Sequence, residues 1–219
     1  MECAKIDPLL NVMLAVQLIS MAIPVIAAIV AFRSLKAWSR LLFVYVSAMM
    51  LVEAGACVSS LLGRHNLWIY NGGILVEFGL LTLAFSTWTG GMLKILFRSS
   101  IAVYFCFWLI EMLNGKYLFE MSSTLFTITY LLLLFISLIC LIHLIMGSNT
   151  LLRDARFWAC ITVLFYTAGD LGTYAIGNYF LTQMYYHDII WIVHLILSIL
   201  VNFLWAGVFL CQHRHHSSG

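Results

Sequence analysis

Residues 131–146 read LLLLFISLICLIHLIM, an apolar run that decides the class of fold. With its flanks, from about residue 119, the run exceeds the roughly 20 apolar residues that a helix needs to cross about 30 Å of hydrocarbon. The strands of a membrane β-barrel are about half that length and alternate between apolar and polar residues. The run therefore predicts a transmembrane helix.

The rest of the chain has the same character. Of its 219 residues, 63% are hydrophobic and 9% are charged, and the mean hydropathy is +1.02. Soluble domains contain about 25% charged residues. The composition therefore predicts an all-α integral membrane protein whose first partner is the lipid bilayer. The basic residues form no patch large enough for nucleic acid, so a nucleic-acid partner is not expected.

Seven apolar stretches predict a single bundle of seven transmembrane helices over residues 1–212. Their approximate bounds are 8–32, 39–62, 67–89, 97–114, 119–146, 155–180 and 188–211, the fourth being the shortest. The first stretch has no basic run before it and no cleavage site after it, which predicts a retained helix and not a signal peptide. Residues 213–219, HRHHSSG, predict a disordered tail, and SSG is typical of a tag remnant.

Basic residues are distributed unevenly between the two ends of the predicted helices. One side holds eight of them and the other side three; the eight are Arg33, Lys36, Arg40, Lys94, Arg98, Arg153, Arg156 and Arg214, and the three are Lys5, Arg64 and Lys116. The positive-inside rule then predicts an external N-terminus and a cytoplasmic C-terminus. The connections are short and carry no nucleotide-binding motif, so function is expected within the bilayer or through a partner.

Ionisable residues inside the predicted helices are few, and a charge in hydrocarbon is costly enough to suggest a function. At about 1.5 Å rise per residue, Glu53, Glu77 and Asp170 lie roughly 14–15 Å below the outer surface, and His194 lies roughly 9 Å below it. Glu111 and His143 lie near helix ends, where long side chains reach the interface.

Helical spacing groups further polar residues with these four. Tyr166, Asp170, Tyr174 and Asn178 recur every four residues, as do His194, Ser198 and Asn202, and such residues share one helix face. Polar faces avoid lipid and point into the bundle. The predicted ligand-binding set is Glu53, Glu77, Tyr166, Asp170, Tyr174, Trp191, His194, Ser198 and Asn202. Interhelical hydrogen bonds that serve packing alone are the simpler alternative.

Three segments resemble an uncharacterised family of small bacterial seven-helix membrane proteins. They are HNLWIYNGGILVEFGLLTLAFSTW (65–88), RFWACITVLFYTAGDLGTYAI (156–176) and DIIWIVHLILSILVNFLWAGVFLC (188–211). The matching positions are Asn66, Trp68, Glu77, Phe157, Trp158, Tyr166, Gly169, Trp191, His194 and Asn202. Asp170 stands where that family usually has Asn, and Ser198 where it often has Asn. The resemblance implies a bacterial inner-membrane protein and implies no particular activity.

Other seven-helix classes fit less well. No predicted span contains lysine, so a covalently bound retinal is excluded. Intramembrane hydrolases of the alkaline ceramidase and adiponectin receptor type use an HxxxH pair, whereas His194 is followed by Ser198. Sugar transporters of the three-plus-three type need an internal repeat that is not visible. A metal site made of Glu53, Glu77, Asp170 and His194 stays open, because these groups suit zinc, manganese or iron.

The favoured interpretation is a receptor-like or sensor module. It would bind a small ligand or protons in an outward-facing pocket, and a cytoplasmic or membrane partner would read the change through the loops RSLKAWSR (33–40) and LLRDAR (151–156). No catalytic residue is assigned. The alternatives are a metal-dependent hydrolase acting on lipid, a proton- or ion-coupled carrier and a structural subunit.

Overall fold

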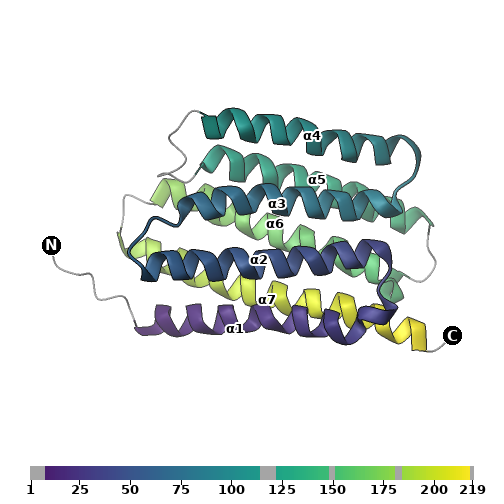
Figure 1. The fold of residues 1–219 in the computed structure, drawn as a ribbon, viewed down its shortest axis with the longest axis horizontal. Coiled ribbons are helices and arrows are strands. Elements are labelled where there is room, and N and C mark those ends of the chain that lie inside the picture. The colour runs from purple at the N-terminus through teal and green to yellow at the C-terminus, as the bar shows by residue number, and fades with distance from the viewer. Residues whose placement is uncertain (1–7, 114–121, 148–150, 181–183, 218–219) are drawn as a thin grey trace.

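The computed structural model describes the backbone of residues 8–113, 122–147, 151–180 and 184–217; the side chains of residues 8–11, 173–191 and 214–217 lie outside this description. The described chain is helical and contains no strand. It has seven α-helices and two short 3-10 helices (Figure 1): α1 Pro8–Ala31, η1 Phe32–Ser34, α2 Ala37–Leu61, α3 Leu67–Trp88, α4 Gly91–Leu113, α5 Ser123–Gly147, η3 Leu151–Arg153, α6 Ala155–Phe180 and α7 Met184–Ser217.

Six of the helices in the described chain are long and apolar enough to cross a membrane; α6 is not among these six. The six crossing segments are Val12–Ser34, Ala37–Leu61, Leu67–Trp88, Gly91–Leu113, Ser123–Gly147 and Ile192–His213. Large apolar side chains such as Ile19, Val103 and Ile95 are exposed on the outside of the bundle, where lipid would contact them. The prediction of an all-α membrane protein is confirmed at this level.

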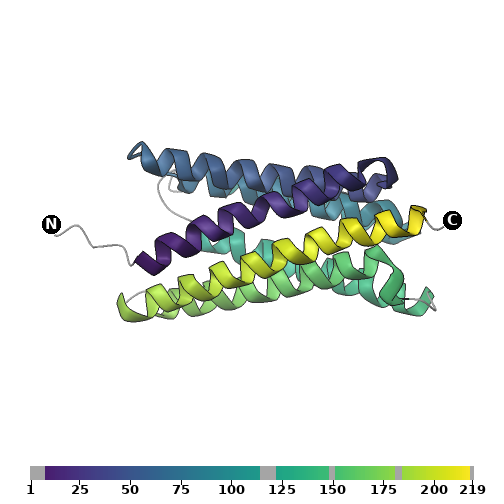
Figure 2. The same cartoon turned by 90° about the horizontal axis from the view of Figure 1, so that it is seen from below.

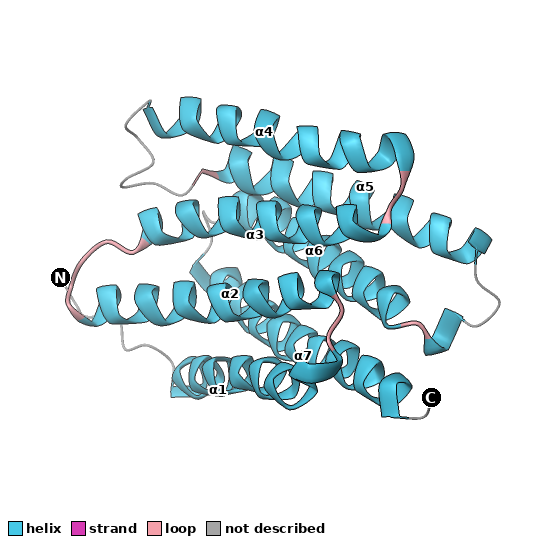
Figure 3. Cartoon of the chain, turned by 45° about the vertical axis from the view of Figure 1, so that its right-hand side comes forward, coloured by secondary structure: helices cyan, strands magenta, loops and turns pink. Residues whose placement is uncertain are grey.

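The helices run up and down, so the two chain ends lie at opposite ends of the bundle (Figure 1). We call the end where α1 begins the N-end and the end where α7 finishes the C-end. Contacts between α1 and α2, α2 and α3, α3 and α5, α5 and α6, α6 and α7, and α7 and α1 close a ring of six helices. Figure 2 shows α1 between α2 and α7, and Figures 1 and 3 show α4 at the edge of the bundle, outside the ring.

The C-end half of the ring is filled by apolar side chains. Trp88 is held edge-on by Trp38 from α2 at 4.9 Å and by Phe85 from its own helix at 5.1 Å between ring centroids. Leu42 and Phe209 are fully buried in the same cluster. The buried polar residues described in this half are uncharged, among them Ser39, Ser86 and Gln212, whereas the buried carboxylates Glu77 and Asp170 lie in the other half.

Two of the predicted helix bounds are wrong. α4 begins at Gly91, not near residue 97, because Gly91 takes a left-handed φ of +56° and lets the helix start directly after α3. Lys94 and Arg98 therefore lie on α4, where long cationic side chains can extend to the interface. α7 continues to Ser217, so residues 213–217 extend the helix where a disordered tail was predicted.

α2 and α3 approach each other closely at Gly73. A Cβ atom at this position would lie 2.9 Å from Cγ1 of Val52, a β-branched side chain with little rotamer freedom, whereas a Cβ at Gly72 would meet nothing within 4 Å. Gly73→Ala is therefore expected to lower the free energy of unfolding by about 1–2 kcal/mol through overpacking. Gly72→Ala should raise it by up to about 1 kcal/mol through helix propensity. Equal thermal shifts of the two detergent-purified variants would contradict this packing.

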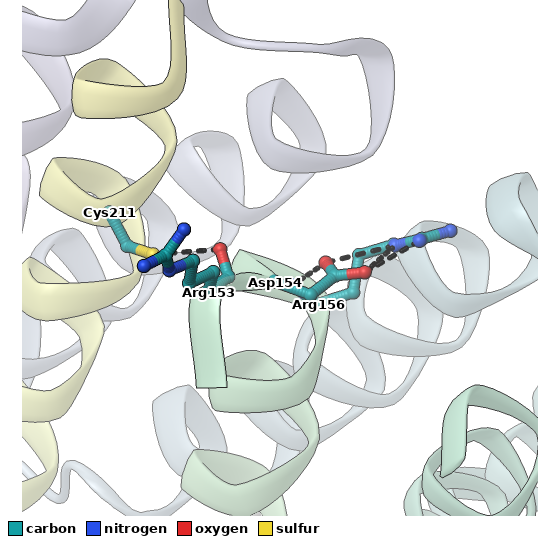
Figure 4. Close-up of polar contacts among 4 residues, drawn as sticks. All are labelled: Arg153, Asp154, Arg156 and Cys211. Atoms are coloured by element: carbon teal, nitrogen blue, oxygen red, sulfur yellow. Dashed lines mark hydrogen bonds and ion pairs between the residues drawn. The ribbon is translucent and has the colours of Figure 1, made fainter. Parts of the chain in front are cut away.

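α6 begins with an N-cap at the C-end. Asp154 Oδ1 accepts the backbone N–H of Arg156 at 2.9 Å, and the Arg156 guanidinium pairs with the same carboxylate, with 2.6 Å between Nη2 and Oδ2 (Figure 4). Beside it, Cys211 Sγ on α7 donates to the carbonyl oxygen of Arg153 at 3.5 Å. Burial raises the pKa of the Asp154 carboxyl, but the hydrogen bonds from Arg156 and the charges of Arg156 and Lys36 outweigh this and hold the pKa below its usual range.

Asp154→Ala is expected to lower the free energy of unfolding by about 1 kcal/mol, the usual effect of losing an N-cap. Because the pKa is lowered in the folded state, the carboxylate stabilises the fold above the unfolded pKa of about 4, and this stabilisation is lost as the pH falls through the folded pKa. Thermal melting near neutral pH and in acid checks both statements. Asp154→Ser, which can still cap, is the control; an Ala variant that melts with the wild type would contradict the capping role.

Candidate functional site

A cavity of about 460 Å³ occupies the N-end half of the ring. All six ring helices line it, and α4 contributes none of the described lining residues. The lining begins at Asn66 and Leu67, where α3 starts at the N-end, and reaches Tyr45 and Trp205 further in. Glu77, eleven residues after Asn66, lies about 16 Å along the helix axis from it. The cavity thus runs from the N-end towards the middle of the bundle.

Two of the carboxylates in the cavity accept hydrogen bonds from tyrosine hydroxyls. Glu77 on α3 is 1% exposed. It accepts a bond from Tyr45 of α2 at 3.3 Å and another from Tyr166 of α6. Glu53 on α2 accepts a bond from Tyr70 of α3 at 3.1 Å. Each carboxylate is therefore bonded to a hydroxyl from a neighbouring helix, which ties α2, α3 and α6 together around the cavity.

The third carboxylate is paired with the histidine. Asp170 on α6 is 1% exposed, and its Oδ1 lies 3.0 Å from Nδ1 of His194 on α7. The adjacent Gly169 explains why these helices come so close, because a Cβ there would clash with a methyl of Leu197 on α7. Small residues allow such close helix approach in membranes. The Asp170–His194 pair therefore lies next to a point where α6 and α7 approach each other closely.

A polar contact also joins α1 to α7 at the cavity wall. Asn202 Nδ2 donates to Ser20 Oγ at 2.8 Å, and Ser20 Oγ donates to the carbonyl oxygen of Gln17 at 2.7 Å. Pro24, four residues after Ser20, has no backbone N–H, so the Ser20 carbonyl lacks its usual helical donor. Gln17, Pro24 and Asn202 all line the cavity. α1 therefore presents a weakened stretch of helix to this space.

An aromatic pair closes the inner end of the cavity. The rings of Tyr45 and Trp205 meet edge-on, with centroids 5.6 Å apart and an interplanar angle of 63°. Trp205 is 2% exposed and is among the largest fully buried side chains of the described core. Beyond it, towards the C-end, lies the apolar core with Leu42 and Phe209. Among the described residues, the lining of the cavity therefore ends at this pair and does not include Leu42 or Phe209.

Most of the predicted site residues meet in this space. The lining includes seven of them: Glu53, Glu77, Tyr166, Asp170, His194, Ser198 and Asn202. The side chains of Tyr174 and Trp191 lie outside the described residues. Glu111 and His143 are absent from the described lining, as their position near helix ends suggested.

The sequence reasoning missed the contributions of α1 and α5 and several aromatic residues. The unpredicted lining includes Gln17, Met21, Tyr45, Phe126 and Tyr130. One signal was present for Tyr45, which precedes Glu53 by eight residues and so shares its helix face. Gln17 had a weaker signal, as an amide within an apolar helix.

The predicted metal-ligand set is not assembled. Within the described chain, no three His, Cys, Asp or Glu side chains come close enough together to hold a metal ion. Lys94 does not belong to this site, because it lies on α4, outside the ring. The described lining of the cavity contains no Lys or Arg. The sequence argument that no span contains lysine is therefore corrected, because Lys94 lies within α4.

Comparisons of the chain with protein families, with curated proteins and with solved structures found no match in any of the three. The resemblance to the bacterial seven-helix family therefore stays a prediction.

Proposed function

We propose that this chain is a receptor-like or sensor module of a bacterial inner membrane, which binds a small ligand or protons in the cavity and passes the change to a partner on the other side. The observation that carries the proposal is the cavity itself. Its lining gathers Glu53, Glu77, Asp170 and His194 from four helices and ends at the Tyr45–Trp205 pair. Buried ionisable groups in a membrane protein are retained chiefly for function.

The proposal includes seven spans with the N-end outside. α6 lies between α5 and α7 in the ring, so it would span the membrane with its neighbours. The C-end carries the basic residues of η1, η3 and their flanks, among them Arg33, Lys36 and Arg153. Such residues favour the cytoplasmic side. The cavity would then be reached from outside, in agreement with the position of Asn66 in its lining.

α7 connects the cavity to the C-end. His194 and Cys211 are seventeen residues apart, about 25 Å along the helix. At the C-end, Gln212 Nε2 donates to the carbonyl oxygen of Ser34 in η1 at 3.3 Å, and Cys211 contacts Arg153 of η3. A ligand or proton that changes the Asp170–His194 pair would shift α7 and, with it, the loops that hold RSLKAWSR and LLRDAR. A partner could read that shift as a population change.

The alternatives have less support. A metal-dependent hydrolase needs ligands grouped around an ion, and the described side chains do not form such a group. A carrier needs a polar route at both ends, whereas the buried carboxylates described, Glu77 and Asp170, both line the cavity and none lies between Trp205 and the C-end.

Hydrogen–deuterium exchange of the full chain in nanodiscs tests the proposal. Asp170→Asn imitates a protonated Asp170, and it is expected to speed exchange several-fold in residues 32–36 and 151–154 at constant pH. Thr162→Val is the matched control, because Thr162 is buried in the same helix, donates to the Trp158 carbonyl oxygen of that helix at 2.8 Å and is not among the described lining residues. A change confined to the neighbours of residue 170 would contradict transmission to the C-end.

A further inference from the structure

We infer that the ligand of the cavity is a small organic cation, an amine or a quaternary ammonium compound. This inference rests on the proposed function of the cavity as a ligand site and names the chemical class that its walls fit. Three features of the lining carry it: the sign of its charges, its aromatic surface and its size.

The charges of the lining are unbalanced. Glu53, Glu77 and Asp170 face the cavity together with a single basic group, His194, and the described lining holds no Lys or Arg. His194 is committed to Asp170 at 3.0 Å, so it can balance one carboxylate at most. Ionised groups in a site of low dielectric need a partner of opposite charge. Glu53 and Glu77 are therefore left for a positive charge that the ligand supplies.

The hydroxyl groups around these carboxylates fit the same interpretation. Tyr45 and Tyr166 point their O–H groups at Glu77, and Tyr70 points its O–H group at Glu53. Hydroxyl donors stabilise a carboxylate in its ionised, accepting form. An anionic ligand would meet these carboxylates, and the described lining holds no Lys or Arg to offset the repulsion. The polar part of the wall thus selects for positive charge.

The walls between the carboxylates are rich in aromatic rings. Tyr45, Tyr70, Tyr130, Tyr166 and Trp205 all line the cavity, and the ring of Tyr130 meets that of Tyr166 edge-on at 5.7 Å. The faces of Trp and Tyr attract ammonium groups, and several such rings around one space recognise quaternary ammonium ligands. A cation could therefore contact carboxylates and ring faces together.

The size of the cavity separates an organic cation from a metal ion. About 460 Å³ falls within the range of roughly 300–1,000 Å³ that holds small organic ligands. A metal ion would need three or more ligand side chains at one point, and the described residues offer no such group. An organic cation needs no common point, because its charge and its apolar carbons can contact different walls.

Binding to the full chain in nanodiscs tests the inference by isothermal titration calorimetry. The probes are tetramethylammonium, choline, putrescine and phenethylamine, each compared with an uncharged analogue; for choline this is the alcohol in which a tert-butyl group replaces the trimethylammonium. At least one cation should bind saturably, and its uncharged analogue should bind at least tenfold more weakly. Absence of binding by every cation, or equal binding of the uncharged analogues, would overturn the inference.

Two variants localise the binding. Glu77→Gln and Glu53→Gln should each weaken the cation at least tenfold, while Glu111→Gln, the same change on α4 away from the cavity, should bind as the wild type does. Because Glu53 is half-buried and Glu77 is buried, the Glu53 variant keeps the test valid if the Glu77 variant does not fold. Cation binding that is unaffected by both variants would overturn the assignment to this cavity.

The outcome also separates this inference from the proposed function. Cation binding in the cavity without any change of exchange in residues 32–36 and 151–154 would support the ligand class and contradict the sensor. Altered exchange in Asp170→Asn with no binding of any cation would support the sensor and overturn the ligand class.

Discussion

Replacing Asp170 with Ala is expected to lower the free energy of unfolding by about 3–5 kcal/mol, the range found when one partner of a buried ion pair is removed. Asp170 is 1% exposed and lies 3.0 Å from His194, so truncation to Ala removes a buried carboxylate from contact with the imidazole. Steric trapping of the protein in bicelles measures the change directly. Ser198→Ala, a small polar-to-apolar change in the same cavity wall, should stay within about 1 kcal/mol of the wild type.

A double-mutant cycle isolates the pair from the general effect of substitution in α6. His194→Ala removes the other partner, and the double variant removes both. Groups in direct contact show interaction energies of about 0.5–3 kcal/mol. The double variant should therefore lose less free energy of unfolding than the two single variants together. Strict additivity would show that Asp170 and His194 do not stabilise each other.

The second large effect is expected at the closed end of the cavity. Trp205→Ala should lower the free energy of unfolding by about 3–5 kcal/mol, as large-to-small changes of buried aromatic residues do. Trp205 is 2% exposed, contacts Tyr45 and separates the cavity from the apolar core. The same measurement in bicelles checks it. Trp68→Ala is the matched control, because Trp68 is 55% exposed and its loss should cost about 0.5 kcal/mol or less.

Trp205→Phe keeps an aromatic ring and tests the nature of the effect. Because the rings of Tyr45 and Trp205 meet edge-on, Phe should recover most of the lost free energy. A Phe variant as unstable as the Ala variant would contradict a role for aromatic packing at the closed end.

Helical periodicity made part of the site predictable from the sequence. Asp170 and Tyr166 are four residues apart, and His194 and Asn202 are two turns apart, so each pair had to share a face. The high cost of charge in hydrocarbon then turned those faces inward. The rise of about 1.5 Å per residue placed Glu53 at nearly the same depth in the membrane as Glu77 and Asp170. These arguments depend on local geometry alone. In the structure, the polar faces of α2, α3, α6 and α7 line one cavity.

The rest depended on contacts between helices that one sequence does not reveal. Nothing in the run around Tyr130 distinguishes a cavity wall from an apolar core, because aromatic residues serve in both. The pairing of Asp170 with His194 rests on the close approach at Gly169, and Gly172 nearby makes no such contact. The start of α4 was missed because Lys94 lowers the local hydropathy although it lies on the helix.

The central claim is that the cavity is reached from the N-end, and cysteine accessibility tests it most directly. In a variant whose native cysteines are replaced, Met49→Cys and Met50→Cys differ by one position on α2; Met49 lines the cavity and Met50 does not, although both are half-buried. In oriented vesicles, a small membrane-impermeant thiol reagent should label the cysteine at position 49 from the N-terminal side and leave position 50 unlabelled from either side. Labelling of position 49 from the C-terminal side, or equal labelling of both positions, would contradict the account.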